Sequence, residues 1–191
     1  MKKLLIINAS PRKNGANGQF IKVINETLPE NVEVKQYDVY KMNVKPCIGC
    51  GYCDKHKVCA FRDIDDFRAD FEDCDAFIIA SPVYFSSFPS PMKALIDRLQ
   101  VYYSLRFTHN IKPPIKKYRP SLLLFTAGSD NKNEIESVVA QSKQFLSILN
   151  TKILKIITKT NTDTKEITAA DITAVKEVLI ELFDEINNPV S

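Results

Sequence analysis

The sequence predicts an α/β fold in which five strands alternate with five helices. Short, uninterrupted apolar runs end at turn residues, as strands buried on both faces of a sheet do. Between these runs, apolar residues recur at the spacing of amphipathic helices. Strands that alternate with helices form parallel sheets through right-handed crossovers. A chain of 191 residues suits one domain, so we expect residues 1–191 to form a single domain with a cysteine-rich loop insertion at about 43–63.

The first half of the chain contains two predicted strands, two predicted helices and one irregular segment. The first strand, Leu4–Asn8, stops at Ser10-Pro11, and helical spacing follows it. Asp63 is expected to cap the second helix at its N-terminus. The other assignments are a helix over Phe20, Ile21, Ile24 and Leu28, a strand over Val32–Tyr37, irregular chain over Met42–Asp63 and a short helix over Ile64–Phe71.

The second half contains three predicted strands and three predicted helices. Ala76–Ala80 is a strongly apolar run, and it is expected to be a central strand that ends at Ser81-Pro82. Pro89 and Pro91 stand where the next helix begins, and proline is tolerated in the first turn of a helix. The later elements are a helix over Met92–Tyr102, a strand over Ser121–Thr126, a helix over Glu134–Leu149, a strand over Lys152–Thr158 and a helix over Ala169–Ile186.

Composition and charge favour a cytoplasmic protein without nucleic-acid or membrane partners. The 26 basic and 23 acidic residues leave a net charge of +3, and the basic residues are scattered along the chain. The densest basic stretch, Lys112–Arg119, is interpreted as a solvated loop, with anion binding as the alternative. No apolar run reaches the length of a membrane span, and Leu4–Ile7 is too short for the core of a signal peptide.

The segment Asn8–Gly18 joins the first strand to the first helix and has the chemistry of an anion site. In an open parallel sheet, ligands bind outside the carboxyl ends of the strands. The segment offers hydroxyl and amide side chains, the cation of Arg12, and glycines that let backbone N–H groups converge. It contains neither a G-x-G-x-x-G motif nor a G-K-[ST] ending. We therefore expect a site for one phosphate, with a plain surface loop as the alternative.

This segment resembles the S-P-R-x-x-G-N-T loop of NADPH-dependent FMN reductases and iron–sulfur flavoproteins, within the flavodoxin-like superfamily. The resemblance implies a three-layer sandwich around a five-stranded parallel sheet of order 2-1-3-4-5, with the loop wrapped around the phosphate of FMN. Two residues depart from the pattern: Ala16 is inserted, and Gly18 stands where a hydroxyl residue is usual. A backbone N–H is therefore expected to contact the phosphate in place of that hydroxyl. The residues implied to bind the phosphate are Ser10, Arg12, Asn17, Gly18 and Gln19.

An aromatic segment, Ser81–Pro89, leaves the third predicted strand. Together with Lys93–Arg98, it resembles the P-x-Y-[WF]-x-x-x-P and K-x-x-I-D-R signature of the same family. An isoalloxazine ring needs an apolar wall and backbone groups aimed at its heteroatoms. The residues implied to supply them are Pro82, Val83, Tyr84 and Phe85.

Two further pairs of residues lie in or next to the predicted binding segments. Thr126 and Gly128 end the fourth strand at the same sheet edge and resemble the third flavin-contacting loop of the family. Asp97 and Arg98 are interpreted as an ion pair on the surface or at a dimer face, rather than as catalytic residues.

Four of the five cysteines crowd into one loop with the spacing C-x2-C-x2-C-x5-C: Cys47, Cys50, Cys53 and Cys59. This spacing suits a loop folded around a cubane cluster, whereas structural zinc favours two separated C-x-x-C pairs. It resembles the compact motif of iron–sulfur flavoproteins, which hold a [4Fe–4S] cluster beside FMN. A cluster, zinc and free or redox-active thiols all remain open. Cys74 is interpreted as a core residue, and His56 as an exposed loop residue.

The resemblance implies an FMN-dependent NAD(P)H oxidoreductase that passes electrons to a quinone, another flavin or a small electrophile. No catalytic acid, base or nucleophile is expected, because the flavin carries the chemistry. One alternative is an iron–sulfur flavoprotein that relays electrons from ferredoxin through a [4Fe–4S] cluster to FMN. Another is a non-enzymatic FMN- or zinc-binding module. The resemblance also implies a homodimer or homotetramer.

Overall fold

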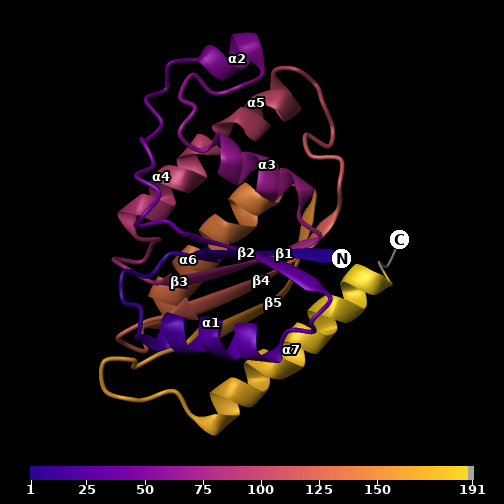
Figure 1. Cartoon of the computed structure of the whole chain (residues 1–191). Coiled ribbons are helices and arrows are strands. Elements are labelled where there is room, and N and C mark those ends of the chain that lie inside the picture. The colour runs from indigo at the N-terminus through magenta and orange to yellow at the C-terminus, as the bar shows by residue number, and fades with distance from the viewer. Residues whose placement is uncertain (189–191) are drawn as a thin grey trace.

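A computed structural model describes residues 1–188 and contains one sheet of five parallel strands between layers of helices (Figure 1). The strands lie side by side in the order β2-β1-β3-β4-β5, and every neighbouring pair is parallel. This confirms the predicted α/β sandwich and its strand order. The strands are Lys2–Asn8 (β1), Val32–Asp38 (β2), Ala76–Pro82 (β3), Arg119–Thr126 (β4) and Thr151–Lys159 (β5).

The helices cover both faces of the sheet (Figure 1). Helices α1 (Ala16–Thr27) and α7 (Ala169–Asn187) lie on one face. The opposite face carries α3 (Asp65–Asp73), α4 (Ser90–Arg98), α5 (Gln100–Phe107) and α6 (Lys132–Leu146), and α2 (Tyr52–His56) lies outermost on that side. Within the described part of the chain, none of these helices combines the length and the apolar character needed to cross a membrane.

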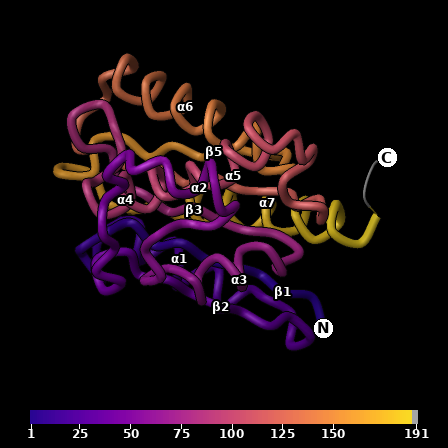
Figure 2. The backbone as a smooth tube through the Cα atoms, turned by 90° about the horizontal axis from the view of Figure 1, so that it is seen from above, coloured from indigo at the N-terminus to yellow at the C-terminus, as the bar shows by residue number. Residues whose placement is uncertain are grey.

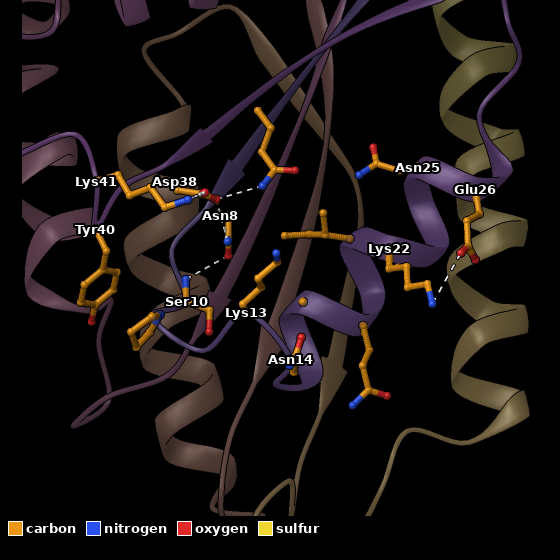
Figure 3. A pocket seen from close by; sticks show the side chains of 15 residues that line it. Asn8, Ser10, Lys13, Asn14, Lys22, Asn25, Glu26, Asp38, Tyr40 and Lys41 are labelled. Atoms are coloured by element: carbon orange, nitrogen blue, oxygen red, sulfur yellow. Dashed lines mark hydrogen bonds and ion pairs between the residues drawn. The ribbon is translucent and has the colours of Figure 1, made fainter.

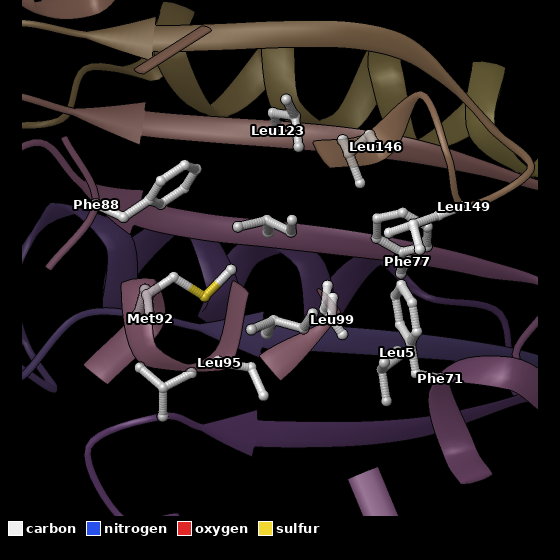
Figure 4. Close-up of a cluster of buried hydrophobic side chains, with 14 of the residues drawn as sticks. Leu5, Phe71, Phe77, Phe88, Met92, Leu95, Leu99, Leu123, Leu146 and Leu149 are labelled. Atoms are coloured by element: carbon white, nitrogen blue, oxygen red, sulfur yellow. The ribbon is translucent and has the colours of Figure 1, made fainter. Parts of the chain in front are cut away.

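Alternate residues of the central strands face opposite helical layers. In β1, Leu4 and Ile6 belong to the buried cluster that contains Phe20 of α1. Leu5 and Ile7 belong to the cluster on the other face, part of which Figure 4 shows around Phe71, Phe77 and Leu123. Because both faces of the strand are buried, its sequence is continuously apolar instead of alternating.

The described residues form seven helices, two more than the sequence predicted. The predicted helix over Met92–Tyr102 is divided at Leu99 into α4 and α5. At the division, the Leu99 N–H bonds to the Ile96 carbonyl at 3.0 Å, and the Tyr102 N–H bonds to the Leu99 carbonyl at 2.8 Å. These bonds span three residues instead of four, so the helical turn tightens there. The second additional helix, α2, lies inside the cysteine loop.

Two charged residues lie elsewhere than predicted. Asp63 does not cap α3: the N-cap position is Ile64, without a side-chain hydrogen bond, and the Asp63 carboxylate accepts the Lys45 N–H at 2.8 Å. Arg119 is not part of a solvated loop but begins β4 and is fully buried. Its guanidinium donates to the carbonyl oxygens of Phe71 and Leu149, while its Nε has no hydrogen-bond partner among the described residues.

Candidate functional site at the carboxyl edge of the sheet

Three of the predicted binding segments meet where β1, β3 and β4 end side by side. Asn8 lies opposite Ala80 in the register of β1 and β3, and Pro82 lies opposite Thr126 in that of β3 and β4. Just beyond the last pair, the Val83 N–H donates to the Thr126 carbonyl at 2.8 Å. The loop after each of these strands therefore starts at one common edge, which is where ligands bind in open parallel sheets.

The loop between β1 and α1 leaves the N-terminus of α1 open. Gly15 is the N-cap, no side chain caps this end, and the first turn contains no acidic residue. Its backbone N–H groups and the positive end of the helix dipole are therefore available to an anion. Ser10 Oγ accepts the Arg12 N–H at 3.2 Å, while the Arg12 side chain is exposed and forms no ion pair within residues 1–188.

Asn17 ties this loop to β4. Its side chain is buried, and Nδ2 donates to Thr126 Oγ1 at 2.9 Å, whereas Oδ1 is buried with no hydrogen-bond partner among the described residues. A threonine hydroxyl can donate as well as accept, so a half-turn of the amide would satisfy Oδ1 and free Nδ2 for a phosphate oxygen. The donor set of the loop therefore fits a phosphate group.

Gly18 has a steric role that the sequence pattern did not reveal. A Cβ atom at this position would lie 1.8 Å from the carbonyl oxygen of Lys13, a backbone atom. The loop therefore closes against α1 at a point where only glycine fits. The sequence showed merely that a hydroxyl residue was missing here.

The aromatic segment after β3 forms a tight turn with strained backbone. Tyr84 and Ser87 exchange two backbone hydrogen bonds, of 2.9 and 3.0 Å, while Phe85 and Ser86 have φ angles of +49° and +62°. Gln141 of α6 holds the turn: its Nε2 donates to the Ser86 carbonyl, and its Oε1 accepts from Ser87 Oγ. The Phe85 side chain is fully exposed. A bulky residue held at positive φ points to a functional position, because such strain clusters at ligand sites.

The other predicted residues line the same edge in different ways. Pro82 is half-buried and Val83 is buried, while Gln19 is exposed on the first turn of α1. Gly128 is half-buried, and a Cβ atom there would lie 2.3 Å from the carboxylate of Asp163.

A cavity of about 730 Å³ adjoins the phosphate loop on the β2 side (Figure 3). Ser10, Gly18 and Gln19 line it, but neither Arg12 nor the aromatic turn does. Its far wall includes Asp38, which is the last residue of β2 and lies at the same edge of the sheet. Sequence reasoning missed this residue, although its place directly after a predicted strand was a usable signal.

Hydrogen bonds hold Asp38 in its charged form. Burial opposes the charge, but bonds from Lys41, Asn8 and Gln36 outweigh it, and the pKa of Asp38 lies below its usual value. Figure 3 shows these bonds, of 2.9 Å each, converging on the carboxylate. The cavity beside the phosphate loop is therefore lined by a polar network in which the Asp38 carboxylate already has its hydrogen-bond partners.

The four loop cysteines line a separate cavity of about 440 Å³. Cys47 and Cys50 are exposed, and Cys53 and Cys59 are half-buried. Among residues 1–188, no three cysteine, histidine or acidic side chains lie close enough together to hold one metal ion. None of the residues predicted to bind FMN lines this cavity. In Figures 1 and 2 the loop that contains α2 lies beside α5, on the outer side of the helices that cover this face of the sheet.

The remaining cysteine and the loop histidine lie as predicted. Cys74 is buried, and burial raises the pKa of its thiol to about 11. His56 is exposed and stacks on Tyr52 with ring centroids 4.1 Å apart.

The interpretation of Asp97 and Arg98 as a surface ion pair is wrong. Asp97 pairs instead with Lys93, one turn earlier on the exposed face of α4, at 2.7 Å. Arg98 is 1% exposed and pairs with Asp63 at 2.8 Å. The two neighbours point to different sides of the helix because successive residues lie about 100° apart.

Comparison with known proteins identifies the family to which the chain belongs. Residues 2–159 match the family model described as NADPH-dependent FMN reductase. The chain is a member of the NADPH-dependent FMN reductase family. Most of the described sheet, from β1 to β5, falls within the matched residues.

Relatives of this FMN reductase family member include iron–sulfur flavoproteins. One from Archaeoglobus fulgidus is 32% identical over 136 residues, which cover 70% of this chain and 58% of the relative. One from Methanocaldococcus jannaschii is 29% identical over 109 residues, which cover 54% of this chain and 56% of the relative. The chain thus matches little more than half the length of these two relatives.

Solved structures support the fold of the family member. An FMN-dependent NADH-azoreductase from Bacillus anthracis, solved in complex with FMN, superimposes with a TM-score of 0.68. The superposition covers 95% of this chain and 99% of the azoreductase, at 14% sequence identity. At this identity the similarity establishes the shared fold.

Proposed function

We propose that this chain is an FMN-dependent NAD(P)H oxidoreductase that passes electrons to a quinone, another flavin or a small electrophile. The observation that carries the proposal is the Asn17–Thr126 hydrogen bond, which joins the uncapped N-terminus of α1 to the end of β4. The aromatic turn leaves β3, which lies between β1 and β4 in the sheet. In the proposal, Ser10, Arg12, Asn17, Gly18 and Gln19 hold the phosphate, while Pro82, Val83, Tyr84, Phe85, Thr126 and Gly128 surround the ring.

The residues of the chain bind and orient, and bound FMN supplies the two-electron chemistry. Backbone N–H groups of the α1 N-terminus and the Arg12 guanidinium donate to the phosphate. Gln141 fixes the aromatic turn through two hydrogen bonds, so the apolar wall is already in place before the ligand arrives. Tyr84 and Phe85 stand open to solvent, which lets an electron donor and then an acceptor approach the same face in turn.

Flavin extraction from the purified protein tests this proposal. We expect FMN and no FAD, because the loop is sized for one phosphate, and we expect NADPH or NADH to bleach the bound flavin. Chromatography of the extracted flavin and anaerobic absorbance spectra measure the two results. FAD as the only flavin would contradict the site assignment. FMN that neither nucleotide bleaches would favour a non-enzymatic binding module.

A second candidate function is an iron–sulfur flavoprotein that relays electrons from ferredoxin to FMN. Two observations favour it: all four cysteines line one cavity, and several relatives bear that name. A [4Fe–4S] cluster takes one thiolate per iron, so its four ligands surround a cavity and do not converge on one ion. Cys47, Cys50, Cys53 and Cys59 would be those ligands.

Metal analysis of anaerobically purified protein tests this second candidate. Wild type should contain about four iron and four sulfide per chain, because each cysteine holds one iron of the cubane. Cys50→Ser should lose most of both, whereas Cys74→Ala, which removes a cysteine outside the loop, should keep them. Zinc without sulfide would identify a zinc site instead. Metal-free wild type would leave a plain FMN reductase.

We also propose that the chain works as a homodimer or homotetramer in the cytoplasm. The Tyr84–Phe85 turn is open to solvent, and a second subunit beside it would complete the wall of the flavin site while leaving one face open to the electron donor and acceptor. The cysteine-rich loop is compatible with a reducing compartment. Light scattering that gives a monomer mass at working concentration would contradict the oligomer.

A further inference from the structure

Both ends of the cysteine loop meet on one buried side chain. Arg98, the last residue of α4, donates through Nη1 to the Lys45 carbonyl at 2.8 Å and through Nη2 to the Phe61 carbonyl at 2.9 Å. Lys45 precedes the first loop cysteine by two residues, and Phe61 follows the last by two. One guanidinium therefore joins the chain entering the loop to the chain leaving it.

Asp63 completes this contact. One oxygen of its carboxylate lies 2.8 Å from Arg98 Nη2, and the other accepts the Lys45 N–H at 2.8 Å. Burial opposes the charge of Asp63, but the Arg98 hydrogen bond and the Lys45 N–H outweigh it, and the pKa of Asp63 is lowered. Arg98, Lys45 and Asp63 form a closed ring of charge-assisted hydrogen bonds, which are stronger than neutral ones, and the Phe61 carbonyl accepts from the same guanidinium.

The same arginine forms part of the cysteine cavity. Arg98 lines that cavity with all four loop cysteines, and its side chain is fully buried. Its guanidinium lies over the Phe61 ring at 5.1 Å, and Nε has no hydrogen-bond partner among the described residues. A buried charge is costly unless nearby groups compensate it, and the Asp63 carboxylate and the two carbonyl oxygens compensate this one.

We propose that Arg98 is a positioning residue that holds the cysteine loop closed and thereby sets the arrangement of its four thiols around the cavity. Only a planar fork reaches two carbonyls and a carboxylate at once, and an ammonium group lacks that geometry. We call this contact of Arg98 with Asp63 and the Lys45 and Phe61 carbonyls the clamp. Without the clamp, the segment 46–60 would have to lose its conformational freedom at the moment a metal centre forms. The inference rests on the proposed cysteine-ligated centre for its purpose, but the clamp itself is a property of the chain alone.

Three variants test the clamp in the FMN-loaded protein. Arg98→Lys keeps the charge but loses the fork. Asp63→Asn removes the negative charge and one of the two acceptor oxygens, and it is the milder change because Arg98 keeps both of its carbonyl partners. Arg119→Lys is the matched control, because Arg119 is also fully buried and donates to two carbonyls, but outside the loop. The readouts are amide hydrogen exchange over 46–60, iron and sulfide content after anaerobic purification, and FMN affinity.

We expect exchange over 46–60 to be at least about tenfold faster in Arg98→Lys, since several charge-assisted bonds are lost. Iron content should fall by more than half, while FMN affinity stays within about twofold of wild type. Asp63→Asn should shift exchange and iron in the same direction by less. Arg119→Lys should lower the unfolding temperature, but amide exchange over 46–60 should not become faster relative to exchange in the rest of the protein.

Two outcomes separate the clamp from the centre it serves. Exchange over 46–60 in Arg98→Lys that equals wild type, or that rises no more than in Arg119→Lys, overturns the clamp. If wild type contains no iron, sulfide or zinc, the proposed centre fails, and the exchange measurement still decides whether Arg98 positions the loop.

Discussion

Replacing Arg12 by alanine should weaken FMN binding on the order of 10- to 100-fold. A hydrogen bond to a charged group contributes roughly 1.5–3 kcal/mol, and each 1.4 kcal/mol is about tenfold in affinity. Arg12 is exposed and forms no ion pair within residues 1–188, so it has no competing partner to leave. Flavin fluorescence quenching on titration of the apoprotein gives the dissociation constants.

Two further variants make this result specific. Arg12→Lys retains the charge without the fork and should fall between wild type and alanine. Lys22→Ala removes one cation from α1, the helix that follows the loop, where Lys22 pairs with Glu26 at 3.7 Å, and should leave FMN affinity within about twofold. Equal affinities for Arg12→Ala and Lys22→Ala would exclude Arg12 as a phosphate ligand.

The fold could be predicted because its signals are local. The five strands lie within two residues of their predicted bounds, since strands such as β1, β3 and β4 are short apolar runs and β2 opens with apolar–polar alternation. The division of one predicted helix at Leu99 was not visible, because apolar spacing continues through the tightened turn and places Val101 and Tyr102 in the core. Periodicity reports which side of a helix is buried, and it does not report a local change in hydrogen bonding.

Buried arginines were the main failure of sequence reasoning at the site. Arg98 and Arg119 both carry a permanent charge, and arginine is seldom fully buried. Their burial depends on carbonyl groups far along the chain, at Lys45 and Phe61 for one and at Phe71 and Leu149 for the other. No pattern within a short window of sequence contains that information.

The phosphate loop was located correctly, but the reason for one of its glycines was not. The sequence pattern treats Gly18 as a missing hydroxyl, which suggests that serine would be an improvement. The structure predicts the opposite, because a Cβ at Gly18 would lie 1.8 Å from the Lys13 carbonyl oxygen and 2.7 Å from its carbonyl carbon. Backbone atoms in a short loop have little room to retreat.

Gly18→Ala and Gly18→Ser should therefore both open the loop and weaken FMN binding by at least about tenfold. Overpacking of this kind costs roughly 1–3 kcal/mol, and here the cost falls on the loop that binds the phosphate. Gly15→Ala is the matched control: its φ is −73°, and the nearest atom to its Cβ is Arg12 Cβ at 3.1 Å, so the neighbour has to give by only a few tenths of an ångström. It should bind FMN within a few-fold of wild type.

The unfolding temperature of each apoprotein separates a local effect from loss of the fold. The Gly18 variants should stay folded, because neither Lys13 nor Gly18 belongs to either buried cluster of the sheet. If Gly18→Ser instead bound FMN as tightly as wild type, its added hydroxyl would be accommodated, and the close approach of Lys13 to Gly18 would not govern the loop. A serine that binds more weakly than Gly15→Ala, in a protein of unchanged thermal stability, is the result that the loop geometry requires.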